Sequence, residues 1–335
     1  MHNMLRTLYA AGALIGFLGA AEMGGAAHEH SRLAVELEKY DASKIADVFY
    51  QLSGDTNDPH KKINHAKGFC ALGTFVPDPK AAKRFDIPLL REKAIPTQAR
   101  FSLGGGDSNA SDKSKARGMA LKIVGAKDSF ETVMLNTEIN FAKDPDEFGT
   151  YFALRVPKNG KVDAKKLAYY TENVDSFKQH AQYMQNLGIT PSVANTAYHS
   201  IHTFYVKEGE KWIAARWKFV PTEGEKTLSE AELKTLGDNF LEQDFKARIA
   251  QKPITYTMLL VLANPNDTTD KTTALWSGKH TEIPLGTLKI DTFNGDVCNH
   301  DVFMPNILPQ GIDAPKDALF DVRNAVYGIT FGRRQ

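Results

Sequence analysis

His65 is the first residue whose type and setting suggest chemistry. It stands in a basic, glycine-containing stretch that runs from Lys62 to Gly68. An imidazole gains or loses a proton near neutral pH, so histidine serves many enzymes as a general acid and base. Taken alone, this stretch leaves open the alternative of a histidine in a turn without any role.

Arg323 and Tyr327 form a second candidate group near the C-terminus. They are four residues apart, so their side chains share a face if this segment is helical. A phenol has a pKa of ~10 and must lose its proton to ligate ferric iron well. Iron supplies most of that bias, and a neighbouring guanidinium stabilises the phenolate further. The alternative is that Tyr327 packs in the core and Arg323 covers it.

Five further segments lie between these two groups in a definite order. They are Arg100-Phe101-Ser102, Arg117–Lys122, Val133–Thr137, His199–Phe204 and Leu308–Ile312. Taken in sequence with the His65 stretch and the Arg323/Tyr327 pair, they resemble the catalase superfamily over most of residues 60–335. The likeness is closest to the short catalase-related haem peroxidases.

The resemblance implies haem b as cofactor, with Tyr327 as the iron ligand, Arg323 beside it and His65 above the iron. His65 would take a proton from one peroxide oxygen and return it to the leaving oxygen. Ser102 would orient His65 through a hydrogen bond. The resemblance assigns haem contacts to four more residues. Lys62, Arg100 and Arg334 would pair with the propionates, and the alternative is that they are surface charges. Phe148 would stack on the porphyrin, and the alternative is plain core packing.

One position departs from the pattern of true catalases. Leu135 stands where they have the distal asparagine, and Asn140 stands where they have a distal-side phenylalanine. An apolar side chain cannot hold a second peroxide by a hydrogen bond, so we expect weak dismutation of hydrogen peroxide. Asn140 restores an amide if it reaches the same site, and it is therefore a candidate catalytic residue. Asn136 is expected on the opposite face of its strand.

The expected function is therefore a haem peroxidase that reduces hydrogen peroxide or an organic hydroperoxide with a small organic electron donor. A true catalase and a lipid-hydroperoxide-rearranging relative are the enzymatic alternatives. A periplasmic haem carrier is the non-enzymatic one, in which Tyr327 binds iron but His65 does no chemistry. Since the long N-terminal arm and C-terminal helical region of full-length catalases are missing, we expect a monomer or small homo-oligomer.

Short apolar runs predict strands at Thr132–Asn136, Tyr151–Val156, Ile201–Lys207, Trp212–Val220, Ile254–Ala263 and Leu285–Ile290. Apolar spacing predicts helices around Phe177–Met184, after the Ser229-x-x-Glu232 capping box, and from about Pro315. Hairpins with helices between them indicate an α+β fold. Together with the resemblance, they predict a catalase-type antiparallel eight-stranded β-barrel with inserted and C-terminal helices.

The N-terminus reads as a signal peptide, residues 1–27, followed by a single haem-binding domain, residues 28–335. One arginine precedes an apolar run from Leu8 to Ala21, which is short of the ~20 residues that span a membrane. We therefore expect a periplasmic or secreted protein with no membrane segment after cleavage. With 41 Lys+Arg against 40 Asp+Glu, the net charge of +1 does not indicate a nucleic-acid partner.

Other chemical signals are weaker. Cys70 and Cys298 either pair or remain two buried thiols. Gly104–Gly106 lacks the spacing of a phosphate-binding loop, and Gly106-Asp107-Ser108 lacks the partners of a hydrolase nucleophile. His28-Glu29-His30 is expected to be a tail segment and not a metal site.

Overall fold

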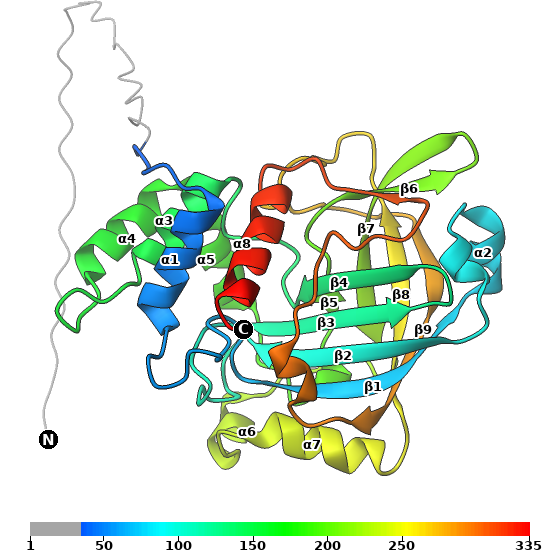
Figure 1. Cartoon of the computed structure of the whole chain (residues 1–335), viewed down its shortest axis with the longest axis horizontal. Coiled ribbons are helices and arrows are strands. Elements are labelled where there is room, and N and C mark those ends of the chain that lie inside the picture. The colour runs from blue at the N-terminus through cyan, green and yellow to red at the C-terminus, as the bar shows by residue number, and fades with distance from the viewer. Residues whose placement is uncertain (1–34) are drawn as a thin grey trace, which may run out of the picture. The chain divides into compact units, whose positions relative to one another are not determined.

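A closed antiparallel β-barrel forms the centre of the computed structural model, which describes residues 35–335 (Figure 1). Its strands, in ring order, are β1 (Gly68–Pro77), β2 (Ile95–Leu103), β3 (Arg117–Val124), β4 (Ser129–Leu135), β5 (Tyr198–His199), β7 (Lys211–Pro221), β8 (Ile254–Leu262) and β9 (Glu282–Phe293). Pairing of β9 with β1 and of β7 with β8 closes the ring. β6 (Phe204–Glu208) and β10 (Ile312–Asp313) extend the sheet beyond β7. The predicted eight-stranded barrel is confirmed.

The barrel closes because apolar side chains alternate along its strands and fill its interior. In β8, for example, Tyr256, Met258 and Leu260 are buried while their neighbours are less so. Phe101 from β2 and Trp217 from β7 join the same core. On β2, the residues that alternate with this core are Arg100 and Ser102, so they lie on the outer face.

Helices cover one side of the barrel (Figure 1). α1 (Ala42–Ser53), α3 (Pro145–Ala153), α4 (Ala164–Asn173) and α5 (Asp175–Asn186) form a helical layer, and α8 (Phe320–Gly332) lies between this layer and strands β3 and β4. The remaining helices are α2 (Pro79–Arg84), α6 (Glu230–Thr235), α7 (Phe240–Ile249) and the short 3₁₀ segments η1 (Pro88–Arg91), η2 (Val193–Asn195) and η3 (Val297–His300).

Three local predictions were wrong. Residues 151–153 belong to helix α3, because Asp144 caps its N-terminus by accepting from Glu147 N at 2.9 Å and Pro145 fits the first helical turn. The strand expected from Ile201 begins only at Phe204. The last helix begins at Phe320 and not near Pro315.

Cys70 and Cys298 form a disulfide, which resolves the alternative that the sequence left open. The expected signal peptide and the His28-Glu29-His30 segment lie outside the described residues. Within residues 35–335, helices long and apolar enough to cross a membrane are absent.

Candidate functional site

Cross-strand pairing on the outer face of the barrel builds the floor of the site. One row across strands β1 to β4 contains Gly68, Ser102, Gly118 and Leu135, and the adjacent row contains Cys70, Arg100, Ala120 and Val133. Residues in direct register lie on the same face of a sheet. The small residues in these rows leave a hollow above the sheet, and α8 covers it.

His65 lies over this floor in a left-handed backbone conformation, with φ of +50°. Such a conformation is uncommon for a residue with a Cβ and persists only where its surroundings hold it. Here the side-chain oxygen of Asn64 accepts from His65 N at 3.0 Å, and Ala66 N donates to Gly105 O at 3.0 Å. Its ring rests on Gly118, where an added Cβ would lie 3.0 Å from Nδ1. The local backbone therefore fixes the direction of this imidazole.

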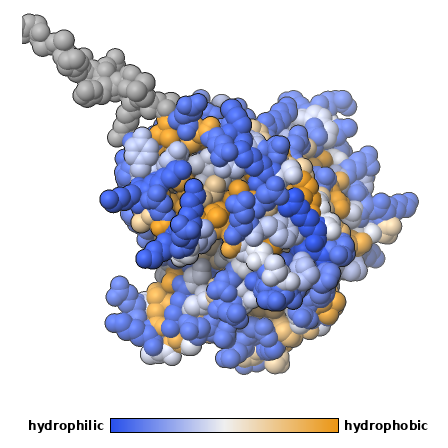
Figure 2. Space-filling model, turned by 60° about the vertical axis from the view of Figure 1, so that its left-hand side comes forward, coloured by the Kyte–Doolittle hydropathy of each residue, from blue (hydrophilic) through white to orange (hydrophobic). Residues whose placement is uncertain are grey.

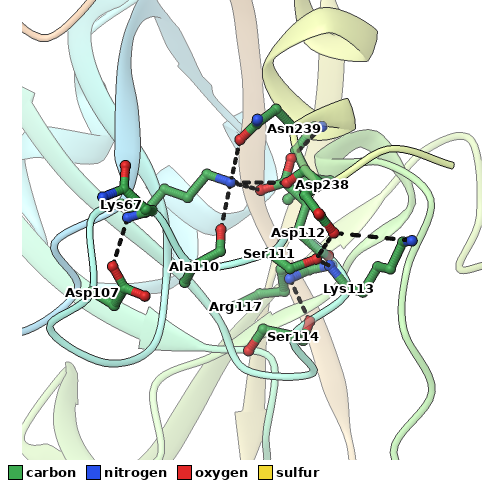
Figure 3. Close-up of polar contacts among 12 residues, drawn as sticks. Lys67, Asp107, Ala110, Ser111, Asp112, Lys113, Ser114, Arg117, Asp238 and Asn239 are labelled. Atoms are coloured by element: carbon green, nitrogen blue, oxygen red, sulfur yellow. Dashed lines mark hydrogen bonds and ion pairs between the residues drawn. The ribbon is translucent and has the colours of Figure 1, made fainter.

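Lys67, two residues further on, ties the same loop to distant segments (Figure 3). Its ammonium lies 2.8 Å from an Asp112 carboxylate oxygen and donates to Asn239 Oδ1 at 2.8 Å. It also donates to the main-chain carbonyls of Ala110, at 2.6 Å, and Asp238, at 3.0 Å. These contacts join the His65 loop to the loop before β3 and to the start of α7.

Ser102 Oγ lies 3.0 Å from His65 Nδ1. Burial, with a smaller contribution from the positive charges of Arg100, Arg323 and Lys62, lowers the pKa of His65 to about 4. The ring is therefore neutral at neutral pH. Because Ser102 contacts Nδ1, Nε2 remains available to other partners.

Three cations gather at one end of the hollow: Lys62, Arg100 and Arg334. Lys62 donates to Asp301 O at 2.8 Å, Arg100 to Asn299 Oδ1 at 2.8 Å, and Arg334 to Asn299 O at 3.0 Å. Among residues 35–335, these three cations make no ion pair. The Asp301 carboxylate instead pairs with Lys122 at 2.6 Å.

Burial and, after it, the mutual repulsion of these cations lower the pKa values of Lys62 and Arg100. Burial, together with the charges of Arg334 and Arg100, lowers the pKa of Lys62 to about 7. Burial likewise lowers the pKa of Arg100 to about 10. Buried cations without anionic partners are costly, so this end of the hollow suits an anionic ligand.

Tyr327 and Arg323 are brought together on α8, as their spacing predicts. Arg323 Nη2 donates to the Tyr327 hydroxyl at 3.3 Å and to Val133 O at 3.4 Å. A buried pair stands nearby, in which His202 Nδ1 lies 2.7 Å from Asp317 Oδ2. Burial, with a smaller contribution from the charge of Arg323, lowers the pKa of His202. For Asp317 burial acts in the opposite direction, but the contact with His202 and the charge of Arg323 lower its pKa.

Two connected cavities occupy the hollow. The cation-lined cavity, which contains Lys62, Arg100 and Arg334, has an empty volume of about 780 Å³. The aromatic cavity, which contains Phe141, Phe148 and Phe152, has about 1330 Å³. His65 and Tyr327 border both. Figure 2 shows the face that carries the helical layer, with a hollow and scattered apolar patches on it.

Leu135 and Asn140 both line the aromatic cavity together with His65. The Asn140 side-chain oxygen accepts from Phe141 N at 2.9 Å. Asn136 lies just past the end of β4 and also lines this cavity, so the expectation that it faces away was wrong. Its side chain holds the backbone of the loop before β3, since it accepts from Arg117 N at 2.8 Å and donates to Lys115 O at 2.9 Å. Phe148 lies within an aromatic cluster, with its ring 5.1 Å from Phe141 and 5.2 Å from Phe152.

The sequence interpretation did not include Gly118, Asn299 or Asp317 in the site. His202 was included only as part of the segment His199–Phe204 that contributes to the resemblance. A signal for Gly118 existed in the Arg-Gly dipeptide that opens β3, but Asn299 and Asp317 reach the site from loops whose positions depend on the whole fold.

The fold and the hollow define an antiparallel barrel protein with a cavity between barrel and helices, bordered by a neutral histidine, a tyrosine and three cations, of which Arg100 and Arg334 are buried. Comparison with known proteins is consistent with this class. The catalase family, described as "Catalase", matches residues 56–334. The chain therefore belongs to the catalase family.

Two catalase-related peroxidases are similar to most of the chain. That of Synechococcus elongatus is 32% identical over 282 residues, covering 82% of this chain and 83% of the relative. That of Mycolicibacterium paratuberculosis is 27% identical over 287 residues, covering 81% and 88%.

Solved catalases share the fold. Catalase A from Saccharomyces cerevisiae superposes with a TM-score of 0.74 at 18% identity, covering 82% of this chain and 61% of that one. A bacterial catalase gives a TM-score of 0.73 at 21% identity, covering 82% of this chain and 57% of that one. This chain thus spans about three-fifths of the length of these catalases.

Proposed function

We propose that this protein is a haem peroxidase that reduces hydrogen peroxide or an organic hydroperoxide at the expense of a small organic electron donor. The observation that carries the proposal is the shared border of the two cavities. His65 and Tyr327 both lie on it, and the uncompensated cations lie at one end. Membership of the catalase family and the likeness to two catalase-related peroxidases support it.

The donor set fits haem b. Lys62, Arg100 and Arg334 would hold its propionates, which supply the negative charge that these three cations lack. Tyr327 would ligate the iron, with the Arg323 guanidinium stabilising its phenolate. Phe148 would pack against the porphyrin from the aromatic cavity. When bound, the haem supplies the two-electron chemistry with peroxide that amino acid side chains do not perform.

The chain supplies the proton transfers. His65 is neutral, so Nε2 can accept a proton from the first peroxide oxygen while Nδ1 remains bonded to Ser102. The same nitrogen can then return this proton to the departing oxygen, which leaves as water from hydrogen peroxide or as an alcohol from an organic hydroperoxide. Proton transfer by a positioned group is typically worth ~10²–10⁴-fold in rate.

The same geometry favours an organic donor over a second peroxide as the reductant. Leu135 lies in register with Ser102 and Gly118 on the floor of the hollow, and it has no hydrogen-bonding group to hold a second peroxide. The Asn140 amide lines the same cavity; its oxygen accepts from the Phe141 backbone, so only its Nδ2 is left to donate to a peroxide. We therefore propose weak dismutation, with Asn140 as a minor catalytic residue.

The test measures two products in one reaction. Haem-loaded protein receives hydrogen peroxide with and without a phenolic donor, and oxygen release and donor oxidation are recorded together. Donor oxidation well above oxygen release supports the peroxidase. Dominant oxygen release would make the protein a true catalase, consumption of a lipid hydroperoxide without donor would indicate a rearranging enzyme, and absence of all three would leave a haem carrier.

The proposal also includes export and a monomeric or small homo-oligomeric state. Export rests on the N-terminal sequence alone. Expression of the full chain with its leader, followed by mass spectrometry of the periplasmic fraction, tests it. Cleavage near Ala21 or Ala27 is the expected result, and an uncleaved chain that stays in the cytoplasm would contradict it.

A further inference from the structure

The segment after β9 supplies most of the oxygen atoms that orient the three cations of the hollow. Asn299 Oδ1 accepts from Arg100 Nε at 2.8 Å, and Asn299 O accepts from Arg334 at 3.0 Å. Asp301 O accepts from Lys62 at 2.8 Å. These residues lie in and just after η3, a short 3₁₀ turn with little regular structure to hold it. The direction of each cation therefore depends on where this segment is fixed.

The disulfide fixes it at the site itself. Cys298 is the residue before Asn299, and its partner Cys70 lies in direct register with Arg100 across strands β1 and β2. Main-chain hydrogen bonds surround the same point, from Cys70 N to Gly295 O at 2.8 Å and from Asn294 N to Cys70 O at 2.8 Å. One covalent link thus joins the strand next to Arg100 to the loop that accepts its hydrogen bond.

The disulfide also lies beneath the cavity wall. Cys70, Cys298 and Phe303 form a small buried cluster against Ala120 and Val133. Phe303, Ala120 and Val133 all line the cation-lined cavity. The disulfide therefore packs against the wall of the cavity as well as lying beside Arg100.

We propose that the Cys70–Cys298 disulfide and Asn299 are positioning elements of the cofactor site, which hold Arg100, Arg334 and Lys62 in the arrangement that receives two carboxylates. This inference rests on the proposed haem function. Without the link, the segment that carries Asn299 separates from β1. The three like charges then lose their shared acceptors, and an anionic ligand is held less firmly.

The test measures release of ferric protoporphyrin IX from the loaded full-length protein to an excess of a haem-scavenging apoprotein. The Cys70→Ala/Cys298→Ala double variant is expected to release it ~10- to 100-fold faster than wild type, the range for losing a charged hydrogen bond. Asn299→Ala, which keeps the disulfide, is expected to lie in the same range. Asn306→Ala is the matched control, because Asn306 is exposed and its side chain makes no hydrogen bond among the described residues.

Protoporphyrin IX dimethyl ester distinguishes positioning from general loss of structure, since it lacks the two carboxylates. The double variant and Asn299→Ala should release the ferric ester at nearly the wild-type rate. A double-mutant cycle with Arg100→Gln should be non-additive, because Arg100 and Asn299 share one hydrogen bond. Circular dichroism confirms that each variant is folded before measurement.

Three outcomes are distinguishable. Faster release of haem but not of its ester supports the inference. Equal release by wild type and both variants, or equal acceleration with haem and ester, overturns it. If wild-type protein binds neither porphyrin, the proposed function itself has failed.

Discussion

Replacing Ser102 by alanine isolates the contribution of the hydrogen bond to His65 Nδ1, which measures 3.0 Å. The change removes one hydroxyl from the floor of the hollow and adds no bulk. His65 keeps its backbone support from Asn64 and Gly105 and its contact with Gly118. We therefore expect the imidazole to remain in place but to be less strictly oriented.

The magnitude follows from the type of bond. A hydrogen bond between neutral groups contributes about 1 kcal/mol net, which corresponds to about a fivefold change in rate. The second-order rate constant for the reaction with peroxide should fall by about that factor in Ser102→Ala. His65→Gln, which removes the base itself, should lower it ~10²–10⁴-fold.

Stopped-flow absorbance of the haem-loaded variants measures both effects. Ser277→Ala is the matched control, because Ser277 is exposed and its side chain makes no hydrogen bond among residues 35–335. An unchanged rate in Ser102→Ala would refute the reasoning that this bond orients the base. A loss as large as that of His65→Gln would refute it too, because it would mean that Ser102 is the essential proton acceptor.

Three more results follow from the structure. Gly118→Ala places a Cβ 3.0 Å from His65 Nδ1 and 2.8 Å from Ser102 Oγ, so the peroxide reaction should slow ~10- to 100-fold with little loss of haem; an unchanged rate would contradict the close packing. An anionic ligand should raise the pKa of Lys62 from about 7. Haem affinity should therefore fall as pH rises above about 7, and Lys62→Gln should flatten this dependence in a binding titration. A wild-type affinity independent of pH would refute this expectation. Burial lowers the pKa of three histidines, His65, His180 and His199, to about 4. The unfolded chain therefore binds more protons than the folded chain between about pH 4 and pH 6.5. The denaturation midpoint of the cofactor-free protein should fall as pH falls through that window, and a midpoint independent of pH would refute this.

Local patterns predicted much of the barrel and the two ends of the site. Short apolar runs correctly indicated β4, β7, β8 and β9, because each of these strands contributes side chains to the core. The spacing of Arg323 and Tyr327 predicted their contact, since a helix alone brings such residues together. The prediction failed at α3, where a proline and an aspartate cap outweighed an apolar run.

The remaining features depend on long-range packing. Residues 200–203 connect β5 to β6, the two strands that pair with β7, and interrupt the sheet there. Within them the buried Ile201 adopts a φ of +62°. His202 meets Asp317, 115 residues away, only because this break in the strand faces α8. The Cys70–Cys298 pairing spans 228 residues and depends on the position of the loop after β9. Sequence spacing carries no information on such contacts.

The absorption spectrum of the haem-loaded protein, recorded before and after one equivalent of hydrogen peroxide, tests the role of His65. Wild type should show a rapid spectral change that a phenolic donor reverses. His65→Gln should show the same change ~10²–10⁴-fold more slowly, although that variant retains its haem. Equal rates in the two proteins, or no spectral change in wild type, would contradict the assignment of His65 as the acid and base of a peroxidase.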